Sequence, residues 1–317
     1  RYPQRELTSA WEAQIYPDHG WGGKNGEITD STFRAKYEYG RRVGKTILAR
    51  STGAIAARIR TSQSKGIPVV VFNSLSWKRS GVVRFTATFP AGTQKKALAV
   101  HDVGGRPLPS QILSVNRYGD GSIRSIELLF TATDVPQVGY ATYYLRPSSR
   151  ALAPDTTSAP LAILQNRFYR VFLGEGGVRQ IIDAELNKEI LNTEKFLGGE
   201  LFTMQSAGED AGEWSAPQQP TMDGFEKLSS YKPTWHLVES GPVRQVVEMR
   251  QDINHVTILQ RVILFSDLKQ IDFETSLLKW DGAKYREFRL AFPLKLQGGR
   301  VTYEVPFGAV EVGNSEM

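Results

Sequence analysis

The spacing of apolar residues changes once along this chain, and that change limits the folds open to it. Residues 4–60 place apolar side chains at helical intervals, whereas from Lys65 onward short apolar stretches alternate with polar residues and turn-forming residues. A period near 3.6 is typical of helices and a period of two is typical of strands. We therefore expect a mainly β fold with an N-terminal helical segment.

The helical segment contains two predicted helices. The first covers residues 4–15, where Leu7, Trp11 and Ile15 share a face, and Pro17 ends it. The second is predicted to begin at Thr29 or Asp30, both favourable N-cap residues, and to run to about residue 60. A pair of helices needs partners to bury its apolar faces, so residues 1–62 are interpreted as part of a helical bundle whose other members lie upstream.

The rest of the chain predicts two β domains, in keeping with a prior of roughly 150 residues per domain. Residues 63–148 predict a small β-sandwich, and residues 149–317 a larger, incomplete one that begins with a Pro- and Ser-rich linker. A long excursion without periodicity occupies residues 208–227. The predicted strands are 67–72, 82–89, 96–103, 110–115, 122–132, 139–145, 162–173, 178–183, 235–238, 243–253, 255–265, 270–278, 287–293 and 300–304.

Composition excludes several classes of protein. The formal charge is +6, but the basic residues are scattered as pairs, so we expect no nucleic-acid partner. No stretch approaches the roughly 18 apolar residues that a membrane-spanning helix needs, so we expect no membrane partner. The absence of cysteine excludes disulfides, thiolate metal sites and a cysteine nucleophile. Localisation stays open between bacterial periplasm and cytoplasm, and oligomeric state stays open too.

The ends of the chain suggest an excerpt from a longer protein. It begins at Arg1 without an initiator methionine or a signal-peptide pattern, and it ends at Met317 without an obvious closing element.

The glycine-rich stretch at residues 16–26 is the strongest candidate for a site. It combines four glycines with Asp18, His19 and Trp21. A neutral histidine can bind a metal, a neighbouring carboxylate can accept a hydroxyl, and a tryptophan offers a flat face for a sugar or a base. The alternative is a connector between two helices, and the residues alone do not decide between the two.

Other candidate motifs favour structural roles. The histidines at 101, 236 and 255 lie in strand-like contexts without metal-ligand spacing, and no G-x-S-x-G nucleophile elbow occurs. Residues 174–177 form a glycine-rich stretch followed by a strand, which predicts a hairpin turn, and residues 251–256 predict a hairpin corner. The acidic residues Glu209, Asp210 and Glu213 are interpreted as a solvated loop. No sequence-local catalytic set is complete.

The order of these parts resembles the C-terminal part of glycoside hydrolase family 38, the α-mannosidases, in a divergent bacterial branch. Residues 69–77 (VVVFNSLSW) resemble the first strand of the family's small β domain. Residues 165–171 (QNRFYRV), with 292–294 (FPL) and 305–308 (VPFG), resemble parts of its large domain. The resemblance implies a helical-bundle remnant, a small β-sandwich and a galactose-mutarotase-like β super-sandwich.

The resemblance also implies a function. The complete enzyme would be a retaining, zinc-dependent hydrolase of α-mannosides, with its nucleophile and acid/base in a missing N-terminal catalytic domain. His19 matches a zinc ligand of the family. Asp18 and Gly20 depart from the family pattern, so Asp18 and Trp21 are candidates for substrate contacts. No catalytic residue is expected in this chain, which alone should be inactive.

A second hypothesis belongs to another class of protein. The chain could be a non-catalytic β-sandwich module that binds carbohydrate or serves as a scaffold. Its exposed aromatic residues would then form the sugar platform. The candidates are Trp21, Trp77, Trp214 and Trp235.

Overall fold

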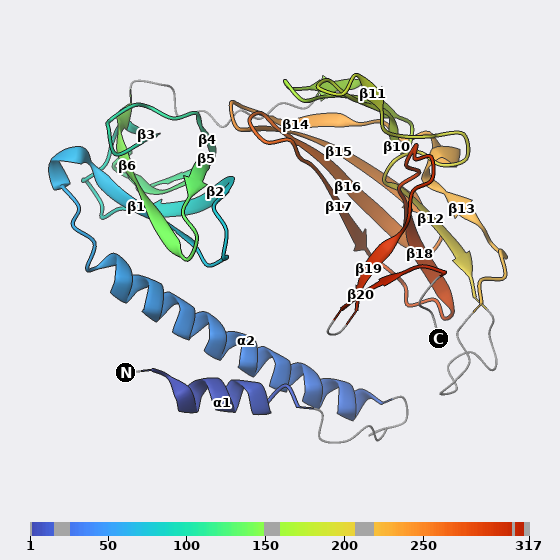
Figure 1. The fold of residues 1–317 in the computed structure, drawn as a ribbon, viewed down its shortest axis with the longest axis horizontal. Helices are drawn as coiled ribbons and strands as arrows, with labels where there is room; N and C mark the ends of the chain where they lie inside the picture. Colours follow the sequence, from blue (N-terminus) through green and yellow to red (C-terminus); the bar gives the residue numbers. More distant parts are fainter. Residues whose placement is uncertain (1, 16–25, 149–158, 207–218, 306–307, 314–317) are drawn as a thin grey trace. The chain divides into compact units, whose positions relative to one another are not determined.

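The computed structural model describes residues 2–15, 26–148, 159–206, 219–305 and 308–313 (Figure 1). The chain forms two compact units that are described separately. The first contains residues 1–79, 101–107 and 134–146, and the second contains residues 80–100, 108–133 and 147–317. Strands dominate the described residues, and two helices open the chain. The predicted fold class is confirmed.

The first unit begins with helices α1 (Gln4–Glu12) and α2 (Glu27–Ala56). The expected length of the second helix is confirmed, but its expected start is wrong. Gly26 is the N-cap in a left-handed conformation, with φ of 79°, and its carbonyl oxygen accepts the first helical hydrogen bond from Asp30 N–H. Thr29 and Asp30 therefore lie inside the first turn, because glycine takes this conformation at little steric cost.

Helices α1 and α2 pair with each other through polar contacts. Arg50 on α2 forms a two-pronged ion pair with Glu6 on α1, the shorter contact being 2.8 Å. Ser9 bonds to Tyr39 on the same face. Neither helix has a buried residue, and Trp11, Ile28 and Leu48 are exposed. The expectation that further helices cover these faces stays a prediction.

All six strands expected for the small sandwich are present. They are β1 (Ile67–Asn73), β2 (Arg79–Thr88), β3 (Ala97–His101), β4 (Ser110–Arg117), β5 (Ile123–Val135) and β6 (Gly139–Ser148). They form two three-stranded sheets of order β1-β6-β3 and β2-β5-β4. The pairing of β1 with β6 is antiparallel and runs from Ile67 opposite Leu145 to Asn73 opposite Gly139.

The larger β region belongs to the second unit and has four sheets. The five-stranded sheet has the order β17-β16-β15-β14-β7, and the others are β11-β10-β9-β8, β13-β12-β18 and β19-β20. Their bounds are β7 (Ala159–Pro160), β8 (Ile163–Gln165), β9 (Tyr169–Gly174), β10 (Gly177–Asp183), β11 (Lys188–Glu189), β12 (Glu200–Gln205), β13 (Glu226–Lys227), β14 (His236–Ser240), β15 (Arg244–Ile253), β16 (Val256–Phe265), β17 (Ile271–Leu278), β18 (Arg286–Ala291), β19 (Thr302–Val305) and β20 (Gly308–Glu311).

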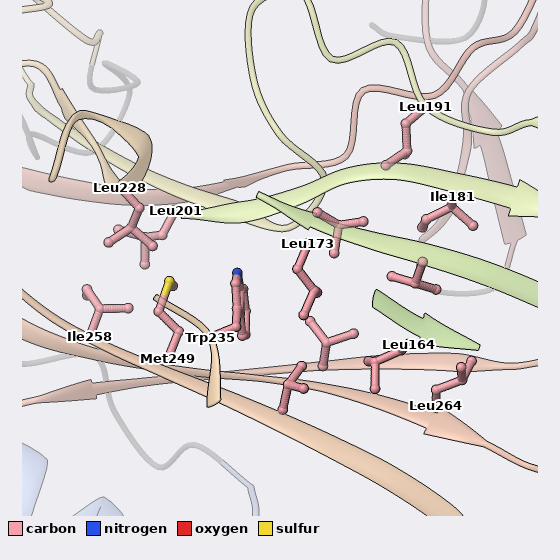
Figure 2. Packing of buried hydrophobic residues seen from close by; sticks show 14 of the residues in the cluster. Leu164, Leu173, Ile181, Leu191, Leu201, Leu228, Trp235, Met249, Ile258 and Leu264 are labelled. Carbon is pink, nitrogen blue, oxygen red and sulfur yellow. The ribbon is translucent and has the colours of Figure 1, made fainter. Parts of the chain in front are cut away.

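The main core lies between these sheets. Figure 2 shows Leu164, Leu173 and Ile181 on the β8–β10 side facing Met249 and Ile258 on the side of β15 and β16. All of these side chains are buried. Apolar burial between two sheets is what stabilises a β-sandwich. The predicted larger β-sandwich is therefore present in the described residues.

Several details of the larger region differ from expectation, and the strands β7, β11, β13 and β20 were not predicted. The single strand predicted over residues 162–173 is two strands, because the Asn166 side chain makes a turn between them. Its Oδ1 accepts hydrogen bonds from the backbone N–H groups of Phe168 and Tyr169 at 2.8 and 2.6 Å. The pattern also missed β12, which begins with the fully buried Glu200.

Candidate functional site

The predicted site at residues 16–26 falls largely outside the described residues. Asp18, His19 and Trp21 all lie in the stretch 16–25, so their positions stay a prediction. The helices that flank it in the chain are described, and Gln14, after α1, contacts the middle of α2. The Gln14 side-chain amide donates to the Lys36 carbonyl oxygen at 3.5 Å, and Gly40 leaves room for that same side chain.

The three remaining histidines do not gather into a metal site. His101 ends β3 and His236 begins β14, as their strand-like contexts predicted. His255 lies instead in the turn between β15 and β16, with φ of 71°, which was predicted as a hairpin corner. Within the described ranges, no group of three or more histidine, aspartate or glutamate side chains could hold a metal ion. Among the same residues no helix is long and apolar enough to cross a membrane.

A polar groove of about 490 Å³ lies in the second unit. It runs between the β2-β5-β4 sheet and the β14–β17 strands. Its charged lining residues are Arg84, Glu127, Glu239, Arg244, Glu248, Arg261 and Glu274. Because arginines and glutamates are interspersed along the groove, each charged side chain can form an ion pair with a neighbour of opposite charge.

The arginines of the groove are paired with carboxylates. Arg84 Nε lies 2.7 Å from Glu127, and Arg244 Nε lies 2.8 Å from Glu239. The hydrogen bond from Arg84 holds the pKa of the Glu127 carboxyl below its usual range. Arg261 lies 2.7 Å from Glu248. Because these charges already neutralise one another, the groove favours a structural role over a catalytic one.

Gln111 on β4 joins the small sheet to the turn between β14 and β15. Its Oε1 accepts from the backbone N–H groups of Val243 and Arg244, each at 3.1 Å, and its Nε2 donates to Glu239 at 2.6 Å. A Cβ at Gly241 would come within 2.6 Å of the Gln111 side chain. Gln111 is buried, so this polar contact is shielded from water.

The tryptophans that were candidates for a sugar platform differ in their exposure to solvent. Trp235 is only 4% exposed, and its Nε1 donates to the Gly174 carbonyl oxygen at 2.8 Å, so it is a core residue and the expectation of a platform there is wrong. Trp77 is 58% exposed. Trp21 and Trp214 lie outside the described residues, as do Glu209, Asp210 and Glu213. Trp280, which the pattern did not single out, is 51% exposed.

Trp280 lies in the loop that follows β17, and the residue after it takes part in a polar pair. The next residue, Asp281, places Oδ2 2.7 Å from His255 Nδ1. That hydrogen bond lowers the pKa of the Asp281 carboxyl. An exposed aromatic ring and a carboxylate–imidazole pair are groups that can contact the apolar and the polar faces of a small molecule.

Comparison with protein families identifies the region that carries Trp280. Residues 164–315 match the family model described as "Glycosyl hydrolases family 38 C-terminal domain". This stretch is similar to the C-terminal domain of glycoside hydrolase family 38. The resemblance drawn from the sequence motifs is thereby confirmed, and the named stretch holds the core of Figure 2 as well as His255 and Asp281.

A curated relative and two solved structures agree with the family 38 assignment. Alpha-mannosidase G from Dictyostelium discoideum is 24% identical over 155 residues, which are 47% of this chain and 14% of that protein. A crystal structure of an alpha-mannosidase from Enterococcus faecalis V583 covers 92% of this chain, with 16% identity and a TM-score of 0.66. A family 38 protein from Enterococcus faecalis covers 98%, with 16% identity and a TM-score of 0.69.

The chain spans only part of each of these proteins. It covers 39% of the first solved chain and 43% of the second. At this identity the structural likeness shows the fold, and the family 38 match adds a similarity to a hydrolase family over residues 164–315.

Proposed function

We propose that this chain is part of a retaining, zinc-dependent α-mannosidase-type glycoside hydrolase that acts on α-mannosides. The observation that carries the proposal is the family 38 match over residues 164–315. It is supported by the fold likeness over 98% of the chain, and by two relatives that are named as α-mannosidases. The partner of the chain is therefore a carbohydrate.

The chemistry would be divided between this chain and a catalytic domain outside it. Retaining glycosidases use one carboxylate as nucleophile and a second as acid and then base, on opposite sides of the scissile bond. We place both in the N-terminal catalytic domain and assign no catalytic residue here. The 317 residues alone would then be inactive, and their role would be to complete and support the site.

His19 is the residue of this chain that we assign to zinc. A neutral imidazole nitrogen is a common zinc ligand, and zinc would supply a Lewis acid that binds sugar hydroxyls. The described part of the chain does not fit a complete zinc site, because it has no cluster of three ligating side chains. The remaining ligands would come from the catalytic domain. Asp18 and Trp21 would contact the substrate from the same stretch.

An activity assay on two proteins tests this division. The 317-residue chain and a longer protein that adds the catalytic domain are each given an aryl α-mannoside. We expect the longer protein to release the aryl alcohol with retention of anomeric configuration. The 317-residue chain alone should release it no faster than a heat-unfolded sample of the longer protein. Hydrolysis by the chain alone would overturn the division of labour, and an inactive longer protein would overturn the function.

A non-catalytic carbohydrate-binding or scaffold module is the second candidate. The exposed Trp280 beside Asp281 is the observation that favours carbohydrate binding. A longer protein that binds α-mannan without hydrolysing any α-mannoside would favour this candidate over the hydrolase.

A further inference from the structure

The end of the family 38 domain that carries the β15–β16 turn brings together an aromatic ring and two polar side chains. Ile253 pairs with Val256 across that turn, and Thr257 pairs with Leu278 on β17. The loop that follows β17 therefore starts beside the turn. The Asp281 backbone N–H donates to the His255 carbonyl oxygen at 3.1 Å, which fastens the loop to the turn.

Trp280 is held in place and is still open to solvent. Its ring meets the half-buried Phe288 ring of β18 at 86°, with centroids 6.2 Å apart. Edge-to-face packing of this kind fixes the orientation of a ring while leaving much of its area uncovered. About half of Trp280 remains exposed, although tryptophan is among the side chains that gain most from burial.

Asp281, the residue after Trp280, forms a fixed polar pair with His255. Asp281 Oδ2 bonds to His255 Nδ1 at 2.7 Å, and Asp281 Oδ1 accepts the Ala283 backbone N–H at 2.9 Å. These contacts set the direction of the carboxylate, and the bond at Nδ1 leaves His255 Nε2 for a further hydrogen bond. Both side chains are partly exposed, so a ligand can reach them.

The backbone around the pair adopts conformations that side chains rarely adopt. Lys279, Tyr285 and His255 have φ of 52°, 55° and 71°, and Gly282 has φ of 79°. Non-glycine residues in the left-handed region cost free energy, and such residues occur often at binding sites. Lys279 and Gly282 lie on either side of Trp280 and Asp281 in the loop after β17.

We propose that Trp280, Asp281 and His255 form a sugar-binding subsite. The apolar face of a pyranose ring would stack on the exposed part of Trp280, and neighbouring hydroxyls would donate to Asp281 and bond to His255 Nε2. The geometry indicates a neutral hexopyranose. The choice of an α-mannoside as that sugar rests on the proposed function.

Titration calorimetry of the full chain with linear α-mannotriose tests the subsite. We expect Trp280→Ala to weaken binding by about tenfold or more, and Asp281→Asn by about threefold or more, because one loses the stacking surface and the other the charged acceptor. Trp280→Phe keeps an aromatic face and should stay within about threefold of the wild type. The control is Trp11→Ala, which removes an exposed tryptophan from α1 in the first unit.

The outcomes separate the subsite from the proposed function. Far-ultraviolet circular dichroism and the unfolding midpoint of each variant show whether it is folded. Unchanged binding in a folded Trp280→Ala variant, equal loss in Trp11→Ala, or no binding by the wild type would overturn the subsite. Trp280-dependent binding combined with an inactive longer protein would support the subsite and overturn only the hydrolase proposal.

Discussion

Asn73 shows how one side chain can organise a turn. It is buried at the end of β1, and its amide nitrogen donates to the carbonyl oxygens of Trp77, Val135 and Pro136 at 2.8, 3.2 and 3.1 Å. Its Oδ1 accepts the Leu75 backbone N–H at 3.1 Å. A carboxamide is a side chain that offers donors and an acceptor in one rigid plane.

Replacing Asn73 by aspartate should destabilise the protein. The carboxylate cannot donate, so three carbonyl oxygens would face a buried negative charge instead of an N–H group. We expect the free energy of unfolding to fall by about 3 kcal/mol, measured by urea denaturation. Asn116→Asp is the control, because Asn116 is exposed and bonds only to Ser125 Oγ. Equal losses in the two variants would contradict the role given to Asn73.

His19 has a test that does not depend on catalysis. In the longer protein, His19→Ala should lower the zinc bound per molecule, measured by elemental analysis after dialysis, because one ligand is lost. His236→Ala serves as the control, since His236 is an exposed strand residue. If zinc content and activity both stay at the wild-type level in His19→Ala, His19 is not a ligand.

The burial of the tryptophan side chains could not be predicted from the sequence. Trp235 and Trp280 both stand next to a strand, and both have polar neighbours. One is covered by the core of the sandwich and the other by a single phenylalanine ring. Local pattern does not distinguish them, because burial depends on which sheet lies opposite. The Trp-Asp-Gly sequence at 280–282 did carry a usable indication, since Asp and Gly favour a turn.

At the scale of elements, Asp183 fastens the end of β10. Its Oδ1 accepts the backbone N–H groups of Glu185 and Leu186, and its Oδ2 lies 2.9 Å from Lys269 Nζ in the turn before β17. The hydrogen bond from Lys269 is the largest cause that lowers the pKa of the Asp183 carboxyl. The ionised form is therefore favoured by folding.

Asp183 should make stability depend on acid pH. Its folded pKa lies below the unfolded value of about 3.9, so its contribution is complete above that value and is lost as pH falls through the folded pKa. We expect Asp183→Asn to reduce the fall in unfolding free energy between pH 6 and pH 3, measured by urea titrations. In the control Asp267→Asn, which removes an exposed carboxylate 3.9 Å from Arg167, the fall should match the wild type. An unchanged pH dependence in Asp183→Asn would contradict the prediction.

Most strands could be predicted from alternation, and the exceptions have physical causes. The hairpins at residues 174–177 and 251–256 form as their turn residues predicted. Strand β12 was not predicted because a charged residue, Glu200, occupies a buried position in it. That carboxylate accepts the backbone N–H groups of Leu197 and Ser229 at 2.8 and 2.9 Å, which makes burial of a charged residue tolerable. Asn166 interrupts an apolar stretch that would otherwise form one strand.

At the scale of the whole molecule, the predicted boundaries at residues 62 and 148 stay predictions. Within the second unit, however, the β2-β5-β4 strands contribute to the surface of the larger region. Val82 on β2 packs against Val246, Ile263 and Phe265. A chain cut at residue 149 would expose that apolar cluster to water.

The isolated segment 149–317 should therefore be less stable than the same region in the full chain. We expect it to bind a fluorescent apolar dye more strongly and to unfold at a lower urea concentration, because three buried side chains become accessible. A segment that starts at residue 80 retains Val82 and Gln111 and is the control. Equal unfolding midpoints for the two segments would show that the boundary at 149 separates independent domains.

The hydrogen bonds by which Gln111 joins β4 to the turn between β14 and β15 (the Gln111 joint) also bear on how far the sequence can diverge while the fold is kept. The Gln111 side-chain oxygen recognises main-chain N–H groups at positions 243 and 244, which every amino acid except proline provides. Position 241 is sterically restricted, because any side chain there would collide with Gln111, and position 239 supplies the acceptor for Gln111 Nε2. The joint can therefore survive extensive replacement of the surrounding side chains, and an attachment of this kind suits a fold shared at 16% identity.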